Sequence, residues 1–256
     1  MKRDFLFMMC AIAMVAAVSG GCKSKQSASE TVTEQVGNNG QIASSWTGTY
    51  VGVLPCADCP GIETKVTISP DGKFVLLQKY LDKDENYFKT EGTVKAGDGK
   101  ISLQDEQNRL VANYSLQRND LKQLDMEGNA ITGELAPNYL LAKVDPLLVG
   151  HRWKLTELNG APVTNDAYLI LDTEDNRISG NLSCNTFSGV YELKPGNRIR
   201  ITNVVATQKM CLNNMEVETE LKKVLGLLDS YTISDSTLVF SRARMAPLAK
   251  FLTPNP

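Results

Sequence analysis

The sequence predicts a mainly β protein, built from two consecutive β domains with one α-helix in the second. Three observations lead to this prediction. From Trp46 onward the chain is a series of short alternating segments separated by turn residues. An apolar period of 3.6 residues occurs in one later stretch, near residues 214–230. Residues 23–45 are polar, without an aromatic side chain, and cannot form a core.

The first residues have the pattern of an export signal. Lys2 and Arg3 precede an unbroken apolar run, Phe5–Val18, which is too short to span a bilayer. Small residues and then Cys22 follow, as in bacterial lipoproteins, whose cysteine is lipidated. We therefore expect a signal peptide at 1–21 and lipidation of Cys22; an ordinary secreted protein is the alternative.

The residues that follow the expected signal-peptide cleavage have the composition of a tether rather than of a folded domain. Residues 22–45 are expected to be a lipidated, disordered linker that holds the folded part near a membrane. Without the leader the chain carries 25 basic and 28 acidic residues, a balance that gives no footprint for nucleic acid. We expect a monomer anchored in the bacterial envelope, in the outer membrane facing the periplasm, where cysteines commonly form disulfides.

The first domain is expected at 46–145 as a small antiparallel barrel. Its alternating segments are spaced about ten residues apart, and turn sequences such as "SPDGK" separate them. The predicted strands are WTGTYVGVL, IETKVTISP, KFVLLQKYL, NYFKTEGTV, KISLQ, RLVANYSLQ, LKQLDM, AITGEL and NYLLAKV. The aromatic side chains expected in its core are Trp46, Tyr50, Phe74, Tyr80, Tyr87 and Phe88.

The second domain is expected at 147–254. Strand patterns begin at Trp153 and continue to about residue 206. The period then changes, with apolar residues at helical spacing in "NMEVETELKKVLGLLDS". Asn213 or Asn214 can cap this helix, and acidic residues in its first turns suit the helix dipole.

Motifs in this second unit resemble the META/HslJ domain family. They are Gly180, Cys184, Asn185, Phe187 and Gly189, followed by Thr207, Met210 and Cys211. The resemblance implies a compact β fold with one helix, and a link to heat shock and envelope or drug stress without an established reaction. A Cys184–Cys211 disulfide fits this pattern, because a 28-residue loop gives about 3.5 kcal/mol of stabilisation by chain entropy. A regulatory redox pair is the functional alternative.

The first unit resembles the N-terminal domain of the NlpE family of outer-membrane lipoproteins. The matching residues are Gly48, Tyr50, Gly52, Leu54, Pro55, Cys56, Ala57, Asp58, Cys59, Gly61 and Ile62. The resemblance implies a lipocalin-like barrel with the two cysteines on a loop after the first strand. It also implies a role in copper resistance and surface sensing.

The motif Cys56-x-x-Cys59 is compatible with three kinds of chemistry. A thioredoxin-like redox pair needs a helix after the first cysteine to stabilise the thiolate, and a strand follows here. Two thiolates suit transient Cu(I) capture, with no other cofactor expected. A Cys56–Cys59 disulfide is the third possibility, and we expect an oxidised pair at rest, with copper or redox sensitivity as a hypothesis.

The sequence does not predict an enzyme. His151 is the single histidine, and no G-x-S-x-G, H-E-x-x-H or phosphate-loop motif is present. Acidic pairs such as Asp105/Glu106 lie in predicted turns. We therefore expect a non-catalytic lipoprotein of the envelope stress response, with an envelope protein as a partner. The alternative is a scaffold that binds lipid, a small ligand or a partner and supports outer-membrane integrity.

Overall fold

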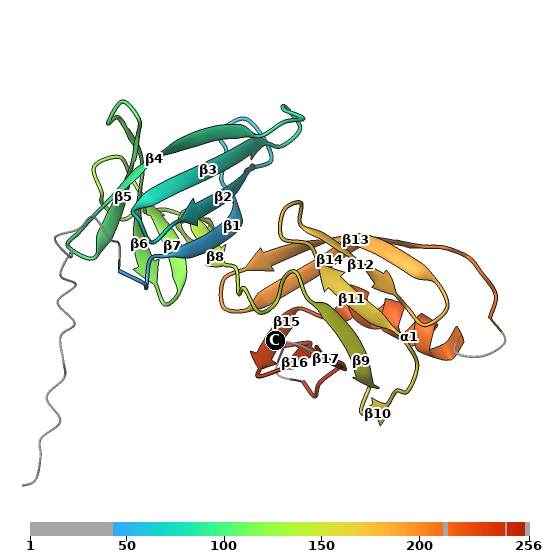
Figure 1. Ribbon diagram of the computed structural model, residues 1–256. Helices are drawn as coiled ribbons and strands as arrows, with labels where there is room; N and C mark the ends of the chain where they lie inside the picture. The colour runs from blue at the N-terminus through green and yellow to red at the C-terminus, as the bar shows by residue number, and fades with distance from the viewer. Residues whose placement is uncertain (1–42, 212–214, 244, 254–256) are drawn as a thin grey trace, which may run out of the picture. The chain divides into compact units, whose positions relative to one another are not determined.

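The computed structural model describes residues 43–211, 215–243 and 245–253, and it confirms the predicted fold class. The described chain is mainly β-strand, with one α-helix and one short 3-10 helix. It forms two separate sheets, which we describe one at a time (Figure 1). The leader, the tether and Cys22 lie outside the described residues. No helix in the described ranges has the length and apolar character to cross a membrane.

The first sheet is a closed antiparallel barrel in which each strand pairs with the next and β8 pairs with β1. Its strands are β1 (Gly48–Leu54), β2 (Ile62–Ile68), β3 (Lys73–Tyr80), β4 (Phe88–Gly97), β5 (Lys100–Asp105), β6 (Leu110–Gln117), β7 (Asp120–Leu124) and β8 (Leu140–Lys143). Closure leaves no free edge, which protects so many short strands from pairing with other chains.

Alternation within each strand fills the barrel. Tyr50 lies opposite Val66, and both are fully buried, while the residues on either side of Val66 in β2 are partly exposed. The buried core of this barrel is Trp46, Tyr50, Leu54, Val66, Ile68, Phe74, Leu76, Val94, Ile101, Leu103, Ala112, Tyr114, Leu121 and Leu141.

Two expectations for this barrel are wrong in detail. Tyr87 and Phe88 are 45% and 57% exposed, because they lie where β4 begins, at the end of the barrel rather than in its middle. The strand predicted at 130–135 is absent. That stretch makes a single isolated bridge at Ala130, and Gly133, with φ of 98°, and the 3-10 helix η1 (Ala136–Asn138) follow.

The second sheet also closes on itself, because β17 pairs with β9. Its strands are β9 (Arg152–Leu158), β10 (Ala161–Pro162), β11 (Tyr168–Leu171), β12 (Arg177–Asn181), β13 (Thr186–Lys194), β14 (Arg198–Ala206), β15 (Ser230–Ser234), β16 (Thr237–Ser241) and β17 (Ala249–Leu252). The two-residue strand β10 forms a hairpin on β9 outside this closed ring.

The helix α1 (Met215–Leu227) lies between β14 and β15 in the chain and contacts β14 and β9 (Figure 1). Its buried side chains include Leu221, Val224 and Leu225, as the helical period predicts. The predicted capping residues Asn213 and Asn214 lie outside the described residues. Glu218 is also buried on this helix, which the apolar pattern does not predict.

Candidate functional site

The first cysteine cluster lies on the loop that joins β1 to β2. Cys56 and Cys59 form a disulfide with an S–S distance of 2.09 Å and a Cα–Cα distance of 5.3 Å. Pro55 and Pro60 flank the pair. Both cysteines are partly exposed, so the bond is within reach of small reagents.

A charged contact ties this loop to the loop between β3 and β4. The ammonium of Lys83 donates a hydrogen bond to the carboxylate of Asp58 and forms an ion pair with it. This hydrogen bond, and then the positive charge of Lys83, lower the pKa of Asp58. The backbone N–H of Leu81 also donates to the carbonyl of Gly61 at 3.0 Å. The two loops therefore form one connected rim at this end of the barrel.

Among the described residues, Cys56, Asp58 and Cys59 form a cluster of side chains that could ligate a metal. One ligand atom from each lies within 4.8 Å of the others. Paired thiolates match the preference of Cu(I) for soft ligands, whereas the carboxylate of Asp58 is a hard ligand already engaged by Lys83. The donor set thus fits Cu(I) when the pair is reduced, and the oxidised pair offers no thiolate.

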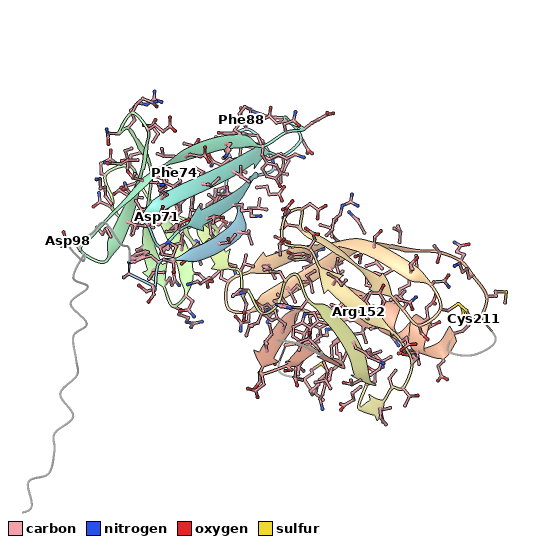
Figure 2. All side chains as sticks on the ribbon, in the orientation of Figure 1. Asp71, Phe74, Phe88, Asp98, Arg152 and Cys211 are labelled. Atoms are coloured by element: carbon pink, nitrogen blue, oxygen red, sulfur yellow. A yellow bond between two sulfur atoms is a disulfide. The ribbon has the colours of Figure 1, made fainter. Side chains whose placement is uncertain are left out.

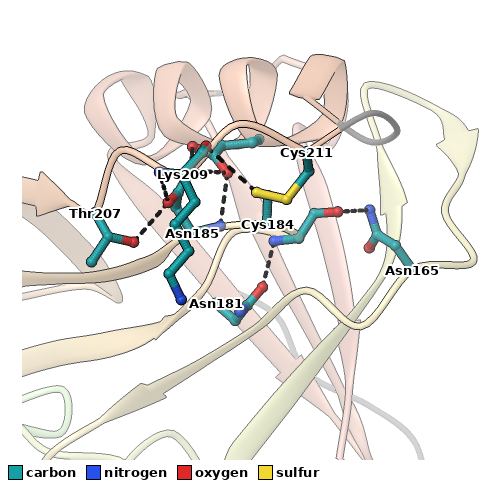
Figure 3. Close-up of a disulfide and its surroundings, with 9 residues drawn as sticks. Asn165, Asn181, Cys184, Asn185, Thr207, Lys209 and Cys211 are labelled. Carbon is teal, nitrogen blue, oxygen red and sulfur yellow. Dashed lines mark hydrogen bonds between the residues drawn. A yellow bond between two sulfur atoms is a disulfide. The ribbon is translucent and has the colours of Figure 1, made fainter.

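The second cysteine cluster lies in the second sheet. Cys184 follows β12, Cys211 lies between β14 and α1, and the two form a disulfide with a Cα–Cα distance of 6.1 Å (Figure 3). Cys211 is exposed and Cys184 is partly exposed. The bond therefore ties a turn of the sheet to the segment that leads into the helix.

The adjacent residue, Asn185, is 1% exposed and joins three parts of the chain. Its Oδ1 accepts hydrogen bonds from the Thr207 hydroxyl and from the Lys209 N–H, each at 2.7 Å. Its Nδ2 donates to the Lys209 carbonyl at 3.0 Å and to Glu218 Oε1 at 2.9 Å. All the hydrogen-bonding capacity of this amide is used, as Figure 3 shows beside the disulfide.

On the helix α1, the carboxylate of Glu218 accepts hydrogen bonds that Asn185 donates. Its Oε2 accepts a hydrogen bond from the Asn185 backbone N–H at 2.9 Å, so this carboxylate contacts both the backbone and the side chain of one residue. The sequence pattern predicts only that acidic residues in the first turns of this helix suit the helix dipole, and it does not predict this contact, which spans 33 positions in the chain. The available signal was an acidic residue on the same helical face as Leu221 and Leu225.

The two disulfides differ in how much they stabilise the fold. They close loops with sequence separations of 3 and 27. Chain entropy gives about 2 kcal/mol for the shorter loop and about 3.5 kcal/mol for the longer one. The Asn185 network also braces the longer loop. The Cys56–Cys59 bond is therefore the one that can be reduced at the smaller cost in stability.

Three other residues weighed in the sequence make contacts that position the chain. His151 contacts the edge of the Trp153 ring, with centroids 6.4 Å apart. Asp105 accepts hydrogen bonds from Arg109, first from its backbone N–H, which lowers the pKa of Asp105. Gly180 lets β12 approach β11, since a Cβ there would lie 2.1 Å from the Tyr168 carbonyl oxygen.

Each of the two sheets lies in a part of the chain that matches a known domain family. The family model of the NlpE N-terminal domain matches residues 50–134, and that of the META domain matches residues 146–255. The chain carries an NlpE N-terminal domain followed by a META domain. The cysteine loop therefore belongs to the NlpE domain, and the Asn185 network belongs to the META domain.

A curated relative and two solved structures share part of the chain. Lipoprotein NlpE of Escherichia coli K12 is 32% identical over 123 residues, which are 47% of this chain and 49% of that protein, so the match spans about half of its length. A lipoprotein structure from Shewanella oneidensis is 41% identical, covering 40% of this chain and 96% of its own, with a TM-score of 0.35. The structure of the Cpx pathway activator NlpE from Escherichia coli is 21% identical, covering 63% and 96%, with a TM-score of 0.31.

Proposed function

We propose that this chain is a non-catalytic lipoprotein of the bacterial envelope stress response, with the Cys56–Cys59 loop as its copper- or redox-responsive element. It is anchored through Cys22 in the outer membrane, faces the periplasm as a monomer, and acts on an envelope protein partner. The NlpE domain spans 46–145 and the META domain 147–254. The similarity to lipoprotein NlpE over about half of that protein supports the envelope role.

The observation that carries the responsive element is the exposure of a small-loop disulfide beside an ion pair. Two electrons and two protons from a dithiol reductant convert the Cys56–Cys59 disulfide to two thiols and oxidise the reductant to its own disulfide. Cu(I) binding to the reduced pair displaces the thiol protons, so binding is favoured as pH rises. If Cu(I) binds, Cys56 and Cys59 would hold it through their thiolates, which are soft ligands of the kind that this ion prefers.

This loop is placed to transmit its state to the rim of the barrel. Asp58 lies between the cysteines and holds Lys83, which lies 25 positions away in the next loop but one along the chain. A change in the backbone of the four-residue cysteine loop moves the Asp58 carboxylate, and with it the Lys83 partner. No catalytic step is needed for such a response.

The test is native mass spectrometry of the full chain, purified in detergent from membranes. The protein is treated with a dithiol, exposed to Cu(I) and labelled at free thiols. We expect Cys56 and Cys59 to be labelled first after reduction, and one Cu(I) to be retained and to protect them. Cys56→Ser with Cys59→Ser should abolish retention, whereas the matched pair Cys184→Ser with Cys211→Ser should not.

Two results would reject the responsive element. One is labelling of Cys184 and Cys211 before the first pair. The other is equal copper retention in both double variants. In either case a scaffold that binds a ligand or a partner becomes the better proposal, and the exposed rings of Tyr87 and Phe88 at one end of the first barrel are the observation that favours it.

A further inference from the structure

A cavity of about 580 Å³ lies on the outer face of the second sheet, at β9 and β17. Its lining includes Arg152 and Lys154 of β9 and Leu252 of β17, and Leu252 lies opposite Lys154 in the strand register. Trp153 and Phe251, the neighbours of these residues in the chain, are fully buried. Alternation along each strand therefore places the lining side chains on the outer face. The volume is in the range of pockets that hold small organic ligands.

Arg152, which Figure 2 labels, packs against an aromatic ring of the neighbouring strand β11. The central carbon of its guanidinium lies 3.6 Å from the centroid of the Tyr168 ring, as in a cation–π contact. Among residues 43–211, 215–243 and 245–253, no carboxylate or carbonyl accepts a hydrogen bond from this guanidinium. Its N–H groups are therefore available to a ligand, and the ring has already restricted the side chain that presents them.

The charged side chains of the cavity leave one net positive charge. Among the lining residues that the structure describes, Arg152 and Lys154 are cationic and Asp166 is anionic. The ammonium of Lys154 donates a hydrogen bond to Asp166 Oδ1 at 3.2 Å and forms an ion pair with it, so this pair is neutral and Arg152 supplies the net charge. A single carboxylate balances this charge and matches the planar guanidinium with two parallel hydrogen bonds, whereas a doubly charged phosphate exceeds it.

A hydroxyl and an apolar side chain add to this lining. Ser236 lies in the turn between β15 and β16, and in the part of the chain that the structure describes its hydroxyl makes no hydrogen bond. Leu252 is 44% exposed, next to the aliphatic stems of Arg152 and Lys154. An apolar group attached to a carboxylate would remove this surface from water.

We propose that this cavity binds a small organic acid that carries one carboxylate and one apolar group. The guanidinium of Arg152 donates hydrogen bonds to the carboxylate, the hydroxyl of Ser236 donates another, and Leu252 packs against the apolar group. Lys154 stays paired with Asp166. The site lies in the META domain and does not use the Cys56–Cys59 loop, so it goes beyond the proposed function and does not depend on it.

The test is 19F NMR of 3-(4-fluorophenyl)propionate mixed with the full chain in phosphocholine detergent, with protein-free micelles as the blank. We expect saturable broadening of the fluorine signal with an affinity on the order of 1 mM. The neutral 3-(4-fluorophenyl)propionamide should bind about tenfold more weakly, because hydrogen bonds to a charged group are stronger. Arg152→Gln should weaken binding of the acid about tenfold and Leu252→Ala about threefold. Arg200→Gln, a matched change at an exposed position of β14, should bind as the wild type does.

Four results would overturn the proposal. One is the absence of saturable binding up to about 20 mM of the acid, well above millimolar affinity. A second is equal binding of the acid and the amide, which would show that the carboxylate is not recognised. A third is displacement of the acid by an equal concentration of inorganic phosphate, which would assign the cavity to phosphate. These three are read on the wild type and do not depend on how the variants fold. The fourth is equal binding of the acid by Arg152→Gln and Arg200→Gln.

Discussion

Replacing Asn185 by alanine should destabilise the META domain more than any change at a neighbouring exposed amide. The substitution removes three hydrogen bonds to the 207–209 segment, whose residues can be rehydrated, at about 0.5 kcal/mol each. It also removes the Nδ2 donor from the buried carboxylate of Glu218, at about 2 kcal/mol. The expected loss is about 3.5 kcal/mol of the free energy of unfolding.

The measurement is urea unfolding followed by the fluorescence of Trp153, which is fully buried in the second sheet. A Trp46→Phe background removes the signal of the other tryptophan in the chain. With a slope of about 1.5 kcal/mol per molar urea, the midpoint should fall by about 2 M. Asn165→Ala is the control: it removes one hydrogen bond to the Ser183 hydroxyl and one from the Ala167 backbone N–H, and it should cost about 1 kcal/mol.

A loss below about 1 kcal/mol for Asn185→Ala would refute this reasoning. So would an equal loss for Asn165→Ala, because the difference between the two rests on the buried contact with Glu218. Glu218→Gln separates the carboxylate from the rest of the network. It keeps the size of the side chain but presents an NH2 group to the donors of Asn185, so the midpoint should fall as well.

Two further predictions concern packing and pH. Gly180→Ala places a Cβ 2.1 Å from a backbone oxygen of β11 and should lower the free energy of unfolding in urea by about 3 kcal/mol. Gly226→Ala has open space around its Cβ and should stabilise α1 by about 0.5–1 kcal/mol. Equal effects of the two substitutions would contradict the close approach of β12 to β11. Burial, and then the charge of Asp120, raise the pKa of Tyr50 to about 12. Because the folded pKa exceeds the unfolded value of about 10, its contribution is complete below pH 10 and about 2–3 kcal/mol should be lost as pH rises to 12. Between pH 9 and 12 the urea midpoint should fall less in Tyr50→Phe than in the wild type. If the midpoint falls equally with pH in both proteins, the ionisation of Tyr50 does not cause the loss of stability.

Much of the fold could be predicted from local patterns. Alternation identified most strands of the first barrel, since residues such as Tyr50 and Val66 face inward at every second position. The change to a helical period located α1, because Leu221, Val224 and Leu225 form one apolar face. Both patterns report which face of an element is buried, and this is fixed by nearest neighbours in the sequence.

Depth within the barrel could not be predicted in the same way. Phe74 and Phe88 both alternate into the inner face, but one is 1% exposed and the other 57%. The difference comes from their distance to the end of the barrel, which depends on the register of β3 with β4. Contacts between distant segments were missed for the same reason, as in the pairing of Asp58 with Lys83.

The two disulfides differ in the cost of reducing them because different contacts surround the loops that they close. Cys184–Cys211 closes a long loop beside a buried amide that already joins the sheet to the helix, so reducing it loosens contacts made by Asn185 and Glu218. Cys56–Cys59 closes a loop whose main attachments are the exposed ion pair of Asp58 and one backbone hydrogen bond from Leu81. Exposed ion pairs contribute about 0–1 kcal/mol, so the barrel core can remain folded when this bond opens. A responsive element must change state without unfolding its domain, and of the two pairs the Cys56–Cys59 loop meets that requirement.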